Sequence, residues 1–243
     1  MLDFALLGQP DCRVKYARTA LRVPAGWQSL LATLILVVAL CFSPSRTYAL
    51  TFYPSESEWL TWPDYCRARY VVSGAGSISK YVNQVSPGEI AHHRKRVGED
   101  AWVYLHHYCA GIVYLNRAAA AEDKQTVDFL LGEAQKEILA QYALLNPQDP
   151  MFSKVSSSIA EVHEARGDVQ TALDFLKRAI EAQPSVASLY AQAAIIYRDA
   201  ARLKDGLKIL EQGDSATDGT SAELNYLLGL FYIEVDDLDS AVV

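Results

Sequence analysis

The sequence lacks the short motifs through which many enzymes bind or activate a substrate. It has no P-loop, no GxGxxG fingerprint, no GxSxG nucleophile elbow and no HExxH zinc motif. It also has no CxxC pair, no CxxCH haem site and no low-complexity tract. We therefore predict no catalytic residue, no cofactor and no metal. The apolar fraction of 51% favours a folded chain over a disordered one.

Positive charge is scarce after residue 49. The whole chain has 22 basic and 29 acidic residues, and residues 1–49 hold five of the basic and two of the acidic ones. The remainder therefore carries a balance of −10. Nucleic-acid binding depends on lysine and arginine at phosphates, so this balance argues against nucleic acid as a partner. It equally gives no reason to expect adhesion to anionic lipid.

One apolar run, residues 29–42, stands out near the N-terminus. It is short for a membrane span, basic residues precede it, and Thr47 and Ala49 are small residues that suit the −3 and −1 positions of a cleavage site. We expect residues 1–49 to be a signal peptide, and the mature protein to be periplasmic or secreted. Two alternatives stay open: an uncleaved anchor in the inner membrane through residues 29–42, and a lipoprotein anchored at Cys41.

Cysteine is rare, and two of the four cysteines precede the expected cleavage. The mature chain would keep Cys66 and Cys109. Because exported proteins fold in an oxidising compartment, we predict a disulfide between them, closing a loop of roughly 40 residues. The alternative is a pair of buried free thiols.

Residues 50–98 predict short helices. Ser55 and Glu58 form a capping-box pattern before the first, and Pro63 and Pro87 suit the first turns of the next two. The basic run at 92–96 fits a solvated helix face. Residues 99–150 predict a longer hairpin, with one helix from Asp100 through the alanines at 118–121 and a second at about 126–145.

Small residues recur at fixed spacing after residue 150. Residues 153–186 carry alanine at their 8th, 20th and 27th positions, a Gly-Asp pair at the 15th and 16th, and proline at the 32nd. The next 34 residues keep all three positions small. A third, incomplete copy begins after one extra residue. Small side chains let paired helices approach closely, because interiors tolerate little overpacking. The small residues of the first two copies are Ala160, Ala172, Ala179, Ala194, Gly206 and Gly213.

This pattern resembles the tetratricopeptide (TPR) repeat, an antiparallel helix pair of 34 residues. The resemblance implies an all-α, TPR-type helix-turn-helix solenoid over 151–243. The 99–150 hairpin would be a divergent unit, and residues 50–98 would form a cap. It further implies a protein-binding groove lined by the first helix of each repeat. In this sequence the groove residues are Glu161, Glu164, Ile195, Arg198, Asp199, Tyr226 and Leu230.

The groove residues predict the chemistry of a partner. They mix carboxylates with apolar side chains, so we expect a protein segment that is apolar with basic flanks. The function predicted is an exported adaptor or assembly factor of the bacterial cell envelope. The alternative is an envelope enzyme whose helices position a substrate. Its candidate chemistry is the cluster of His106, His107 and Cys109, but adjacent histidines point about 100° apart on a helix and zinc needs three or four ligands.

Overall fold

The computed structural model describes residues 52–236, all of which belong to the unit spanning Thr51–Val243. The expected signal peptide and residues 237–243 lie outside the described range. Within it every regular element is helical and no strand occurs, as the sequence predicts. Among the described residues, no helix is long and apolar enough to cross a membrane. The helices are α2 (Glu56–Thr61), α3 (Asp64–Val71), η1 (Gly76–Ile78), α4 (Pro87–Val97), α5 (Glu99–Ala120), α6 (Lys124–Tyr142), α7 (Phe152–Ala165), α8 (Val169–Ala182), α9 (Ala187–Asp199), α10 (Leu203–Ala216) and α11 (Ala222–Glu234).

Local capping determines where the short N-terminal helices begin. Ser55 and Glu58 form the predicted capping box, in which the Glu58 carboxylate accepts from the Ser55 N–H at 2.7 Å. A second capping box, formed by Ser86 and Glu89, begins α4. The helix predicted to end near residue 145 ends at Tyr142 instead, because residues 143–145 turn back with hydrogen bonds to the preceding carbonyls.

The N-terminal helices are covalently tied to α5. The structure contains the predicted disulfide, which joins Cys66 on α3 to Cys109 on α5 with their Cα atoms 5.5 Å apart. The indole N–H of Trp62 donates to the Cys109 carbonyl at 3.0 Å, and Arg69 donates to two carbonyls of α5 at 2.8 Å. Residues 52–98, which the sequence predicts to be a cap, therefore pack on α5 of the first hairpin.

The small residues of the repeats lie where two helices meet. Ala160, Ala172, Ala179 and Ala194 are each completely buried. A Cβ atom built on Gly213 would lie 2.6 Å from Cγ of Tyr190, far inside van der Waals contact. The 34-residue spacing therefore reflects close approach of paired helices. Asp218 and Gly219, at the end of the second repeat, both adopt positive φ and form a turn.

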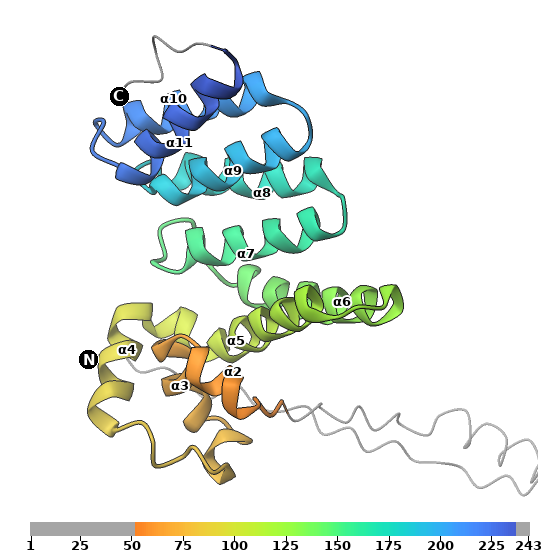
Figure 1. Cartoon of the computed structure of the whole chain (residues 1–243). Coiled ribbons are helices and arrows are strands. Elements are labelled where there is room, and N and C mark those ends of the chain that lie inside the picture. Colours follow the sequence, from red (N-terminus) through yellow and green to blue (C-terminus); the bar gives the residue numbers. More distant parts are fainter. Residues whose placement is uncertain (1–51, 237–243) are drawn as a thin grey trace, which may run out of the picture. The chain divides into compact units, whose positions relative to one another are not determined.

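The helices follow one another as stacked antiparallel pairs (Figure 1). The pairs α5–α6, α7–α8 and α9–α10 each pack together, and each pair then contacts the first helix of the next. The first helices also contact one another in the order α5, α7, α9, α11. This neighbour-to-neighbour arrangement is that of a helical solenoid.

One ion pair links the cap to the end of α5 and predicts a response to acid. Arg117 Nε donates to Glu58 at 2.6 Å, and this bond is the largest cause that lowers the pKa of Glu58 from 4.5 to about 2. A lowered carboxyl pKa stabilises the folded state above pH 4.5, and that stabilisation is lost as pH falls toward 2. We expect Glu58→Gln to cost about 1–2 kcal/mol at pH 7 and almost nothing at pH 2. Urea unfolding across this pH range measures the difference, and an equal cost at both pH values contradicts it.

Candidate binding groove

The predicted groove residues lie on neighbouring first helices. Two hydrogen bonds join α7 to α9: Ser157 Oγ donates to Gln192 Oε1 at 2.6 Å, and Gln192 Nε2 donates to the Ser157 carbonyl at 3.1 Å. α9 in turn contacts α11. The three helices are therefore neighbours, and we use the name groove for the seven residues on them that the sequence predicts to bind a partner.

Two groove carboxylates have raised pKa values. Protein atoms that displace water raise the pKa of Glu161 and Glu164, and the negative charges of Asp199 and Glu161 raise the pKa of Glu164 further. The Glu161 side chain is exposed, so water reaches it although protein surrounds it in part. That combination is expected in a concave wall. Within residues 52–236 neither carboxylate has an ion-pair partner.

The arginine of the groove forms an ion pair with the next residue of its own helix. Arg198 Nε donates to Asp199 at 3.2 Å, and both side chains are more than a third exposed. A pair this exposed contributes well under 1 kcal/mol to folding, so it is easily exchanged for contacts with a partner. The carboxylates of Glu164 on α7 and Asp199 on α9 are therefore close enough for the charge of Asp199 to raise the pKa of Glu164, while Arg198 pairs with Asp199.

The apolar side of the groove lies on α11. Tyr226, Leu230 and Ile233 recur at intervals of four and three residues, which places them on one face of the helix. Tyr226 is 68% exposed and Ile233 is 54% exposed, whereas Leu230 is half-buried. Ile195 is half-buried on α9, the helix that contacts both α7 and α11. An exposed apolar stripe next to charged groups is typical of an interaction surface.

The cap contributes side chains that the sequence analysis did not identify. The Tyr108 hydroxyl pairs with Ser158 Oγ of α7 at 3.2 Å, and the Tyr65 side chain of α3 is close enough to Tyr108 for each to influence the pKa of the other. Burial raises the pKa of Tyr108, and the charge of Glu161 raises it further. Lys154 Nζ lies 6.0 Å from the Tyr65 ring centre. The acidic end of the groove therefore borders the cap, which no local signal in an irregular segment could have revealed.

The two histidines of the cluster contact other charged side chains of the protein. His106 Nδ1 lies 3.1 Å from a guanidinium nitrogen of Arg69, while His107 Nδ1 lies 2.5 Å from a Glu137 oxygen. Burial, then the neighbouring His107 and Arg69, lower the pKa of His106 to about 4. The Cys109 sulfur is bonded to Cys66 in the disulfide, so it is not a free thiolate ligand. In the part of the chain that the structure describes, no three metal-ligating side chains gather at one point.

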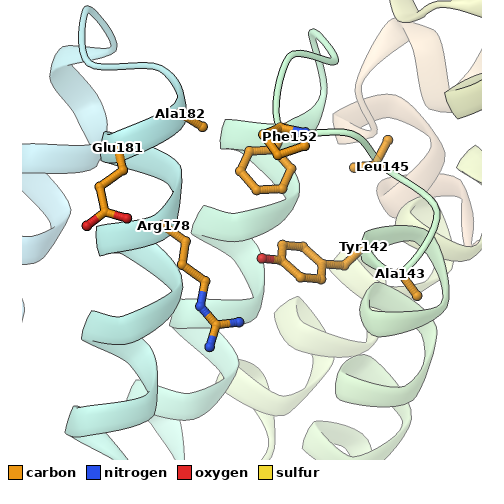
Figure 2. Close-up of a pocket in the computed structure, with 8 residues that line it drawn as sticks. Tyr142, Ala143, Leu145, Phe152, Arg178, Glu181 and Ala182 are labelled. Atoms are coloured by element: carbon orange, nitrogen blue, oxygen red, sulfur yellow. The ribbon is translucent and has the colours of Figure 1, made fainter.

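A separate pocket lies on the side of the second helices, between the end of α6 and α8 (Figure 2). Its volume is about 570 Å³, and its walls include Tyr142 and Phe152, whose ring centres lie 5.5 Å apart. Figure 2 shows the Tyr142 hydroxyl pointing toward the Arg178 side chain, while Glu181 points away. The sequence analysis did not predict this pocket. Its mostly apolar walls hold no catalytic arrangement.

The solved structures that are similar to this chain include two of MamA. One, described as "MamA MSR-1 C2", is 13% identical, with 64% of this chain and 80% of that chain covered and a TM-score of 0.40. The other, a crystal structure of MamA, is 17% identical, with 65% and 90% covered and a TM-score of 0.39. No protein-family model and no curated protein matches the chain. The assignment of an all-helical repeat fold therefore rests on the helices and their small-residue contacts.

Proposed function

We propose that this protein is an exported scaffold of the bacterial cell envelope that holds a partner protein in the groove. The observation that carries the proposal is the pair of carboxylates of Glu161 and Glu164 on α7, which form no ion pair within the described residues and whose pKa values are raised by desolvation. Placing charge where water is partly excluded opposes folding, so such residues are kept more readily for binding than for stability.

Export is the second half of the proposal. The apolar run at 29–42, followed by small residues before Leu50, supports a cleaved signal peptide and a periplasmic or secreted location. The buried disulfide supports the same location, since disulfides persist in oxidising compartments. We propose that the protein acts there as an adaptor or assembly factor, because the described residues offer a surface for contacts with a partner and not a group of reactive side chains.

Substitutions that neutralise or reverse the charges of Glu161 and Glu164 are expected to weaken partner binding without destabilising the folded protein. Because their pKa values are raised, the two carboxylates favour the folded state less as pH rises through those values. Replacing both with glutamine should therefore leave stability at pH 7 equal to or above wild type. The same variant, and more so Glu161→Lys with Glu164→Lys, should lose at least about tenfold in partner recovery.

The test is crosslinked affinity capture of the protein from its native envelope fraction, read by mass spectrometry. A matched control reverses two exposed acids of the second helix α8, Asp174→Lys with Glu181→Lys, which changes net charge equally but leaves the groove intact. One or two partners lost only with the groove variants support the proposal. Partners retained by the lysine variant, or no partner in the envelope fraction, overturn it.

A further inference from the structure

Three successive first helices each contribute a different binding position to the groove, and we call these three positions seats. α7 presents the carboxylates of Glu161 and Glu164, α9 presents the side chain of Ile195, and α11 presents Tyr226 with Leu230. Since α7 contacts α9 and α9 contacts α11, the seats follow one another in that order. Charge and apolar surface are therefore segregated along the groove, rather than arranged as an apolar centre with two acidic ends.

The other charged side chains near the groove do not change this order, in which the acidic position on α7 is followed by the apolar positions on α9 and α11. Lys154 lies against the Tyr65 ring, seven residues before Glu161, and Arg198 is paired with Asp199. Glu223 and Glu234 are exposed at opposite ends of α11, outside its apolar middle. A cation of a partner is therefore expected to pair with Glu161 and Glu164, which form no ion pair within the described residues.

The spacing expected for seats on neighbouring packed helices matches one backbone conformation. Packed helices lie about 8–10 Å apart. A polyproline-II segment makes one turn every three residues with a rise of about 3.1 Å, so residues i, i+3 and i+6 point to one side at intervals of about 9 Å. A β-strand alternates its side chains, and so cannot direct every third residue to the same surface.

From this match we infer that the groove binds an extended, polyproline-II-like protein segment with a basic residue at position i and apolar residues at i+3 and i+6. The basic residue lies at Glu161 and Glu164, and the two apolar residues lie at Ile195 and at Tyr226 with Leu230. The inference rests on the proposed function and deepens it, because it states the order and spacing that the partner must carry.

Two peptides of identical composition test the order. The first is Arg-Ala-Pro-Leu-Ala-Pro-Leu, and the second, Leu-Ala-Pro-Arg-Ala-Pro-Leu, moves arginine to the middle, where it would face Ile195 beside Arg198. Both have blocked termini and a neutral fluorophore, and anisotropy is measured on the oxidised full chain. We expect the first to bind about tenfold more tightly, a difference of roughly 1.4 kcal/mol. A third peptide lacking one spacer should bind as weakly as the second.

A substitution cycle assigns the preference to the carboxylates. Glu161→Gln with Glu164→Gln should weaken the arginine-first peptide about five- to tenfold. The same variant should leave a peptide with glutamine in place of that arginine unchanged. Equal affinity for the two isomers, equal effects on the arginine and glutamine peptides, or no binding up to about 1 mM overturns the inference. A partner captured from the envelope alongside any of these outcomes leaves the proposed function standing, so the two failures are distinguishable.

Discussion

Replacing Cys66 and Cys109 by alanine is expected to lower the free energy of unfolding by about 4 kcal/mol. The disulfide spans 43 residues, and closing a loop of that length removes this much conformational entropy from the unfolded chain in the chain-entropy model. Both cysteines are essentially buried, so the variant also leaves space at the contact between α3 and α5. Urea unfolding of the two proteins under non-reducing conditions measures the difference.

The control for the cysteine variant is the wild-type protein unfolded in the presence of a reductant. Once its disulfide is reduced, wild type should approach the stability of the variant, because both then lack the crosslink. The cap should be affected more than the repeats, since the disulfide ties α3 to α5 and does not touch α7 to α11. A loss below about 1 kcal/mol would show that the unfolded chain is already restricted by other means.

Gly213→Ala is expected to lower the free energy of unfolding by about 2–3 kcal/mol, although alanine is the better helix former. The added Cβ would lie 2.6 Å from Cγ and 2.7 Å from Cβ of Tyr190. These atoms are next to the backbone of a buried residue whose hydroxyl donates to the Pro184 carbonyl at 3.0 Å, so the ring cannot swing aside. Overpacking therefore exceeds the gain of about 1 kcal/mol from helix propensity.

Gly132→Ala is the matched control for that substitution. Gly132 is also inside a helix, α6, but a Cβ there meets only the Arg166 guanidinium at 3.5 Å, an ordinary contact with a flexible side chain. This variant should be more stable than wild type by up to about 1 kcal/mol. Thermal and urea unfolding of both alanine variants decide the matter, and a stabilised Gly213→Ala protein would contradict the close helix approach.

The repeats and the helix starts were predictable because their signals are local or periodic. A capping box involves residues three apart, as with Ser55 and Glu58, and the sequence therefore displays it directly. The small residues recur because every repeat meets the same steric limit, and Ala160 and Ala194 show that limit as complete burial. The disulfide followed from counting, since an exported chain would retain only two cysteines.

The sequence by itself determined the helical class, the register of the first two repeats and the helices expected to line the groove. Only the tertiary structure decided how these side chains differ in their surroundings. The charge of Asp199 that raises the pKa of Glu164, and the Tyr65 side chain near Tyr108 and α7, involve residues 35 to more than 90 positions apart. Solvation and Coulomb interactions depend on distance in space, which periodicity along a chain does not record.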